Sequence, residues 1–252
     1  MTRPQFNDYA PAAIAKRQLK AERVASALLD VPKAQVLLDG LPPSLCQENV
    51  ANFRRDFRQE FLDLHEPMTP HPQLTLWFVT VIHPSWVTSA GELSPGLLRD
   101  IREWAYRRLL KADQVRLFSG IIDFTWSIGT DVEGLFWQPH IHAVVAVSEM
   151  VEGQARKYLR RIFRTPKNRL LRIHRPLRVQ EVTALEGALE YCSKALLIDG
   201  LVRRSSWISP TSGRRRSAAA SLQRPQLLEI GRLMMTSTLD DRVIHLEEPP
   251  WN

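Results

Sequence analysis

The sequence predicts an α+β fold: a ferredoxin-like or RRM-like antiparallel sheet with its helices on one face, preceded by N-terminal helices. Between residues 74 and 182, strand-like runs and helix-like runs follow one another in the order β-α-β-β-α-β. This order is the split βαβ arrangement of ferredoxin-like sheets. The chain has 252 residues, of which 44% are hydrophobic, which is enough for one substantial domain with appendages or for two small domains.

Four segments have the composition of strands. Residues 74–82 read LTLWFVTVI, a continuous apolar and β-branched run that is typical of a strand buried on both faces. Residues 115–128 and 136–147 are the second and third strands of the pattern. Residues 171–182 form a weaker fourth candidate, because Pro176 restricts it to a sheet edge or a bulge.

Three segments have the composition of helices. Residues 94–112 carry the clearest start signal, with Ser94 at the N-cap and Pro95 at the first helical position. Residues 149–164 and 184–197 are the second and third. The last of these follows the βαββαβ pattern as an additional helix.

The sequence predicts that the chain divides into three parts. Residues 1–65 form an N-terminal helical region that Pro42 and Pro43 interrupt, and residues 66–200 form the central domain. Residues 201–252 form a basic loop and a C-terminal extension. The start of the extension is rich in Ser and Arg and predicts a mobile loop. A helix at 225–235 follows, and residues 241–247 form a short strand or an extended end.

Charge and cysteine content limit the function classes. A net charge of +7 and a pI near 9.8 favour a polyanionic partner, nucleic acid first and acidic membrane second. The two cysteines, Cys46 and Cys192, form no CxxC pair, so the sequence supports neither a zinc knuckle nor a disulfide framework. The sequence shows no apolar signal region and no run of 18 apolar residues, so we expect a cytoplasmic protein without a membrane partner.

The pair His140 and His142 is the sharpest local motif. Side chains alternate across a strand, so the two imidazoles of His140-Ile141-His142 point to the same face and can bind one metal ion. Hard cations also need oxygen ligands. Asp123 is the first candidate, because a carboxylate within an apolar strand is costly to bury unpaired. Glu133 is the second candidate, and a structural hydrogen bond is the alternative role for Asp123.

Tyr191 and Lys194 lie three residues apart on the predicted helix 184–197, so they share nearly one face. The nearest neighbours of Tyr191 on that face are mostly small, and Gly187 is one of them. Small neighbours leave room for a sugar-phosphate chain beside the phenol. The alternatives are a tyrosine at the edge of the core and a surface pair between Lys194 and Glu190.

Residues 156–178 contain ten arginines and lysines and no acidic residue. Arg156, Arg160 and Arg164 recur every four residues and form one helical stripe, which suits a phosphate backbone. The other predicted DNA-binding residues of this region are Arg161 and Arg172. A second contact is predicted at Arg214–Arg216, where the neighbouring Trp207 can stack on a base.

Three of these motifs together resemble the HUH endonucleases, specifically the rolling-circle replication initiators. Trp77–Val81 loosely resembles their first motif, an apolar strand similar to FLTLT. Pro139–Val145 closely resembles the second, an HxH strand preceded by Pro, and Tyr191 with Lys194 resembles the third, YxxK. The resemblance covers about half of the chain, from 74 to 197, and a Tyr that follows HxH fits initiators rather than relaxases.

The resemblance implies a nicking enzyme that uses Mg²⁺ or Mn²⁺. Tyr191 would attack a DNA phosphate to give a 5′-phosphotyrosine and a free 3′-hydroxyl, with Lys194 steadying the phosphate or favouring the ionised phenol. Asp123 stands where related initiators place a Glu. Implied partners are single-stranded DNA or an origin hairpin, and a host helicase and DNA polymerase.

Two departures from the family concern how the reaction ends. Some plasmid initiators carry a Glu four residues before the Tyr, where this chain has Gly187, and the helix has no second Tyr. A single-Tyr transposase and a non-catalytic single-strand nucleic-acid-binding module are the alternative functions.

Overall fold

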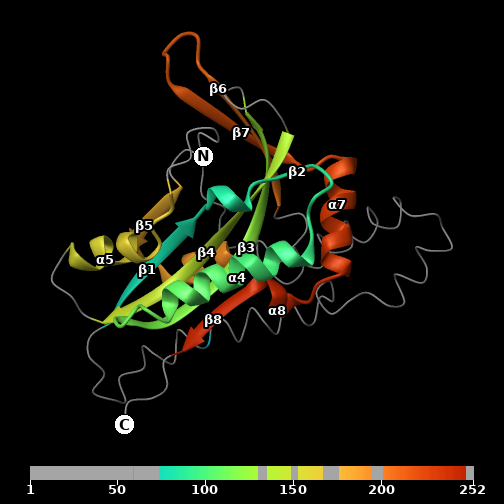
Figure 1. The fold of residues 1–252 in the computed structure, drawn as a ribbon. Coiled ribbons are helices and arrows are strands. Elements are labelled where there is room, and N and C mark those ends of the chain that lie inside the picture. The colour runs from blue at the N-terminus through green and yellow to red at the C-terminus, as the bar shows by residue number, and fades with distance from the viewer. Residues whose placement is uncertain are drawn as a thin grey trace.

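A computed structural model describes the following residues: Gln59, 74–129, 135–148, 153–166, 176–193 and 201–247. They form the expected α+β fold around one curled, mostly antiparallel sheet (Figure 1). Its strand order is β5-β1-β4-β3-β6-β7, with β2 beside β4 and β8 beside β3. Within the described part, no helix has both the length and the apolar character that a membrane span requires.

Four central strands confirm the predicted pattern. They are β1 (Leu74–Val81), β3 (Val115–Gly129), β4 (Leu135–Ser148) and β5 (Leu177–Glu181). Both β1 and β3 pair antiparallel with β4, so β1 and β3 run parallel to each other with β4 between them. β5 pairs antiparallel with the other edge of β1 and is therefore parallel to β4. These are the two interlocked split βαβ units of a ferredoxin-like sheet.

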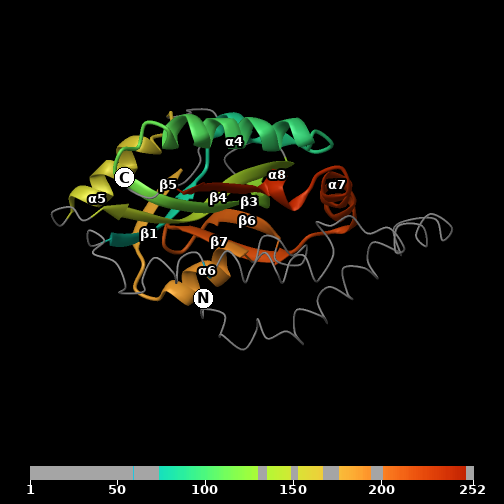
Figure 2. The ribbon, with the colours of Figure 1, turned by 90° about the horizontal axis from the view of Figure 1, so that it is seen from below.

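The two connecting helices are α4 (Pro95–Leu109) and α5 (Gln154–Ile162). As predicted, Ser94 caps α4 by accepting a hydrogen bond from the backbone N–H of Leu97. Both helices pack on one face of the sheet, as Figure 2 shows. The main hydrophobic core lies beneath them and includes Phe118 and Phe124 of β3.

The additional helix α6 (Leu185–Ser193) packs on the opposite face of the sheet (Figure 2). A second, smaller cluster holds it there, in which Leu189 and Cys192 contact a patch that includes Ile121 and Val144. The predicted placement of helices on one face therefore describes α4 and α5, whereas α6 covers part of the other face.

Because α6 covers only part of its face of the sheet, β1 is not buried on both faces as the sequence predicted. Val79 and Val81 are fully buried towards α4 and α5, whereas Phe78 and Thr80, which point to the α6 side, are only half-buried. The α6 side of the sheet therefore keeps solvent access around these two residues.

The prediction of a mobile loop after residue 201 is wrong. This segment forms a hairpin of β6 (Val202–Ile208) and β7 (Arg215–Ser221). β6 pairs in parallel with Thr125–Gly129 of β3. The hydrogen bonds to β3 order a segment whose composition, rich in Ser and Arg, contains no local strand signal.

The rest of the C-terminal extension confirms the predicted helix and strand, as α7 (Arg224–Met235) and β8 (Val243–Glu247). The short helix α8 (Leu239–Arg242) leads into β8. Two small elements that the sequence did not predict follow β1: the 3-10 helix η2 (Pro84–Trp86) and the strand β2 (Thr88–Ser89).

Parts of several sequence-based predictions lie outside the described residues. They include the N-terminal helical region (of which only Gln59 is described), residues 149–152 of the predicted second helix, residues 171–175 of the predicted fourth strand, and residues 194–197 of the third helix.

Gly120 allows β3 and β4 to pair closely near their middle. It lies opposite Ala143, next to the pair of Ile121 with His142. A Cβ at position 120 would lie 2.8 Å from Cε1 of Phe118 and 3.0 Å from Cβ of Ala143. A side chain at this position therefore forces the hairpin or the core to shift.

We predict that Gly120→Ala destabilises the protein by about 1–3 kcal/mol, the usual cost of overpacking. Gly187→Ala is the control, because Gly187 lies within α6 with open space around it. That exchange should stabilise the protein by up to about 1 kcal/mol through helix propensity. Urea unfolding of both variants measures the difference, and a Gly120→Ala variant as stable as the parent would contradict this role.

Candidate metal centre

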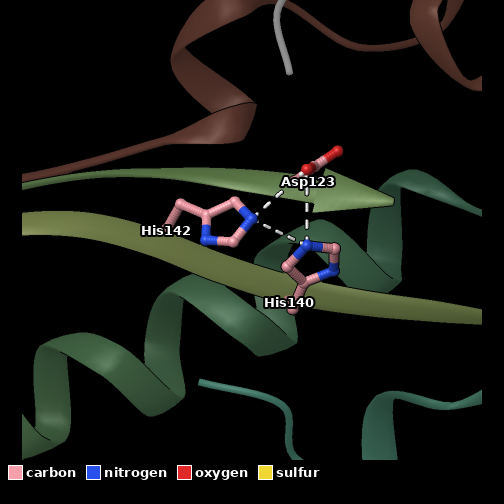
Figure 3. Close-up of side chains that lie close together, drawn as sticks. All are labelled: Asp123, His140 and His142. Atoms are coloured by element: carbon pink, nitrogen blue, oxygen red, sulfur yellow. Dashed lines mark hydrogen bonds and ion pairs between the residues drawn. The ribbon is translucent and has the colours of Figure 1, made fainter. Parts of the chain in front are cut away.

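Two neighbouring strands bring Asp123, His140 and His142 together. Asp123 of β3 lies directly opposite His140 of β4 in the antiparallel register, and His142 is the next residue of β4 on the same face. All three side chains lie on the α6 face, because they alternate in step with Ile121 and Val144, which pack in the cluster with α6, and Figure 3 shows them converging. The predicted HxH pair and the predicted carboxylate therefore form one group.

The three ligating atoms form a small triangle. The Nε2 atoms of His140 and His142 are 2.9 Å apart, and they lie 3.3 Å and 3.4 Å from Oδ2 of Asp123. The three residues are buried, with exposed fractions of 3% for Asp123, 7% for His140 and 4% for His142. They are the one such group of His, Cys, Asp and Glu side chains among the residues that the structure describes.

This triangle fits a metal ion. Neighbouring ligands of an octahedral ion with bonds of about 2.1 Å are about 3.0 Å apart. The separations of 2.9–3.4 Å therefore match one triangular face of such a coordination shell. The three side chains can hold a metal ion and would leave its other positions for further ligands.

Outer contacts orient each of the three side chains. The backbone carbonyl of Gln138 lies 3.1 Å from Nδ1 of His140. Because a carbonyl can only accept, Nδ1 donates and Nε2 keeps its lone pair for the centre. Oγ1 of Thr80 lies 3.0 Å from Nδ1 of His142 and holds the orientation of that ring by a hydrogen bond. The backbone N–H of Phe124 donates to Oδ1 of Asp123 over 2.7 Å, which leaves Oδ2 facing the imidazoles.

The centre is built for positive charge. Burial alone would raise the pKa of Asp123, but the adjacent His140 and His142 hold this pKa well below its ordinary value. The carboxylate therefore stays ionised beside the two imidazoles. Three electron-rich atoms at this spacing repel one another unless a metal ion or a proton on one of the imidazoles lies between them.

The guanidinium of Arg242 is a buried positive charge close to Asp123. Its side chain is fully buried, and burial lowers its pKa to about 10, although the negative charge of Asp123 opposes this shift. Arg242 precedes β8, whose first residue Val243 pairs with Ile121 of β3. The C-terminal extension therefore contributes to the electrostatics of the centre.

Tyr191 of α6 lies at the border of this centre. Its ring centroid is 4.9 Å from that of His142 and 5.5 Å from that of Phe78, both in edge-to-face geometry. Phe78 also lies 5.7 Å from His142, so the three rings contact one another. Tyr191 is 37% exposed, in contrast to the buried ligands beside it. The predicted nucleophile and the predicted metal ligands therefore share one face of the sheet.

The predicted arginine stripe lies elsewhere. Arg156, Arg160, Arg161 and Arg164 are exposed on or just after α5, which packs on the face opposite to α6. The guanidinium of Arg156 lies over the ring of Trp77 at 5.7 Å. The sheet thus separates this stripe from the metal centre. Lys194, Arg172 and Glu133 lie outside the described residues.

Sequence reasoning missed three contributors to the site: Thr80, the carbonyl of Gln138, and Arg242. Thr80 has a signal, because a threonine within the apolar run LTLWFVTVI alternates with Val79 and Val81 and so faces the histidine side. Its partner, however, depends on the register of β1 with β4. No local pattern connects Arg242 with Asp123, because they lie far apart along the chain.

Comparison of the chain with protein-family models, with curated proteins and with solved structures found no match in any of the three.

We predict that the parent protein binds one Mn²⁺ and that His140→Ala abolishes this binding. Acid protonates imidazoles in competition with the ion, so the affinity should fall as the pH is lowered from about 8 to about 5.5. Titration calorimetry measures both effects. The control is His83→Ala, because His83 lies outside the centre and contacts Trp86 and Trp104. Equal Mn²⁺ affinity of the parent and His140→Ala would contradict the assignment.

A separate prediction concerns the support of His142. Thr80→Val keeps the shape of the side chain but removes the hydroxyl beside Nδ1. Loss of such an outer contact typically weakens metal affinity by about 10- to 100-fold. The same calorimetric titration should show this loss with the thermal stability nearly unchanged. An unchanged Mn²⁺ affinity in Thr80→Val would remove Thr80 from this role.

Proposed function

We propose that this protein is a metal-dependent endonuclease that nicks single-stranded DNA at a replication origin, similar to the HUH initiators of rolling-circle replication. The observation that carries the proposal is the position of Tyr191, whose ring centroid lies 4.9 Å from that of His142 beside three converging ligand atoms. A partly exposed phenol next to a buried metal-binding group suits nucleophilic attack on a bound phosphodiester.

Asp123, His140 and His142 would hold the ion, Mg²⁺ or Mn²⁺. When bound, it would neutralise the anionic oxygens of the scissile phosphate and polarise the phosphorus. Two imidazoles and one carboxylate would leave room on a bound ion for phosphate oxygens and water.

Tyr191 would carry out the covalent step. Its phenolic oxygen forms a bond to phosphorus, the bond from phosphorus to the 3′-oxygen breaks, and the proton of the phenol is lost while the 3′-oxygen gains one. The products are a 5′-phosphotyrosine and a free 3′-hydroxyl. One phosphodiester replaces another, so the strand can be rejoined, and the 3′-hydroxyl can serve a DNA polymerase.

The surroundings of Tyr191 suit a strand of DNA. Gly187, one turn before it on α6, is exposed with open space where a side chain would be, and Ala184 is also exposed. The net charge of +7 favours a polyanionic substrate. Lys194, three residues after Tyr191, stays a predicted phosphate contact, and a host helicase stays a predicted partner.

We predict that Tyr191→Phe abolishes the covalent protein–DNA adduct, because only the attacking oxygen is lost. The assay incubates protein and Mn²⁺ with single-stranded oligonucleotides that tile the DNA flanking the coding sequence, and detects the adduct on denaturing gels. Tyr106→Phe is the matched control, because Tyr106 belongs to α4 on the opposite face of the sheet. Mn²⁺ binding should be the same in both variants.

Three outcomes separate the proposal from its alternatives. An adduct that persists in Tyr191→Phe removes this residue from the role. An adduct that forms only with oligonucleotides from the ends of a mobile element indicates a transposase of the same chemistry. Salt-dependent binding of DNA by the parent without any adduct indicates a non-catalytic binding module.

A further inference from the structure

The β6–β7 hairpin is a basic two-stranded ribbon that extends beyond the rest of the sheet. β6 pairs with β3 only as far as the pair of Gly129 with Ser206, and the hairpin continues past this point, as Figure 1 shows at its top. Its turn is ordered by hydrogen bonds between Ser209 and Arg214 and between Gly213 and Ser209, both 2.8 Å long. The hairpin is thus a formed structural element at the edge of the sheet.

The charge of this hairpin is entirely positive. Residues 201–223 contain five arginines, at positions 203, 204, 214, 215 and 216, and no acidic residue. Arg204, Arg214 and Arg216 are exposed. Among the described residues, no carboxylate forms an ion pair with any of these three. Like charges gathered on one exposed element repel one another, and a polyanionic partner would relieve this repulsion.

The arginines lie on both faces of the ribbon. Arg204 pairs with Ser127, two positions from Thr125 and four from Asp123, so it belongs to the face of the metal centre. Arg203 pairs with Trp126 and belongs to the opposite face. Arg216 shares that opposite face, because it lies three positions before Ala219, the partner of Arg204. A single strand of DNA would follow one face, whereas the two phosphate backbones that border a duplex groove flank both.

The size and side chains of the ribbon fit a groove. The major groove of B-DNA is about 12 Å wide and admits a two-stranded β-ribbon. β7 is the outermost strand of the ribbon and pairs with no further strand in the described part of the sheet. From Ser217 to Ser221 it carries only small residues, all of them exposed. Small side chains at this edge permit close approach to the floor of the groove.

The ribbon also points away from the candidate active site. β6 begins at the level of Thr125, two residues beyond Asp123, and runs parallel to β3. Ile208 therefore lies about 26 Å along the strand direction from the level of Asp123, at about 3.3 Å per residue. This length corresponds to about seven or eight base pairs at about 3.4 Å each.

We propose that the β6–β7 hairpin binds the double-stranded stem of a DNA hairpin adjacent to the single strand that the metal centre and Tyr191 hold. The proposal rests on the proposed function for the identity of the polyanion. It gives the duplex stem a surface distinct from the arginine stripe of α5, and it places Arg204 about 13 Å along the strand direction from the level of Asp123.

The experiment compares two triple variants of equal charge. Arg204, Arg214 and Arg216 are replaced by Ala in the first, and Arg156, Arg160 and Arg164 of the α5 stripe in the second. Fluorescence anisotropy in EDTA measures binding to a DNA stem of about 12 base pairs with a single-stranded tail, and to the tail alone. Circular dichroism checks that both variants keep the parental fold.

The hairpin variant should bind the stem probe at least about 10-fold more weakly than the parent, and the slope of log affinity against log salt should fall by roughly one per arginine. Its affinity for the tail alone should change less than about 3-fold. Parental affinity for the stem, an equal loss on the tail alone, or an equal loss of stem binding in the α5 variant would each overturn the proposal. The assay needs no cleavage, so a failure of Tyr191 to form an adduct is a separate result.

Discussion

The antiparallel pairing of β3 with β4 is the constraint on which the rest of the site depends. It sets Asp123 opposite His140, and the alternation of strand side chains then brings His142 to the same oxygen. A slip of one residue would turn the carboxylate to the opposite face from the imidazoles. Gly120 favours the observed register, because a residue with a Cβ in this place opposite Ala143 would lie only 3.0 Å from Cβ of Ala143.

The two faces of the sheet carry very different amounts of hydrophobic core. One face carries α4, α5 and most of the hydrophobic core, whereas the other carries α6 and a much smaller cluster. The sparse cover leaves Phe78 and Thr80 half-buried and Tyr191 partly exposed beside buried polar ligands. A buried group of one carboxylate and two imidazoles is costly to desolvate, so the large core on the far face must support it.

The sequence predicted the βαββαβ core well because its signals are local. Apolar β-branched runs, the cap at Ser94 and the alternation in His140-Ile141-His142 each need only a few neighbouring residues. The carboxylate position of Asp123 was also predictable, because a lone acid in an apolar strand requires a partner. Features that depend on long-range pairing were not predictable: β6 is a strand because β3 binds it, and α5 carries its arginines to the face away from Tyr191 because the chain crosses behind the sheet.

Hyperfine spectroscopy of bound Mn²⁺ tests the central claim, that one ion joins the three ligands and a DNA phosphate beside Tyr191. We expect nitrogen couplings from two imidazoles in the Mn²⁺-loaded protein. We also expect a new phosphorus coupling once a single-stranded oligodeoxynucleotide is added. A spectrum of fully hydrated Mn²⁺, or imidazole couplings with no phosphorus coupling at saturating DNA, would contradict it.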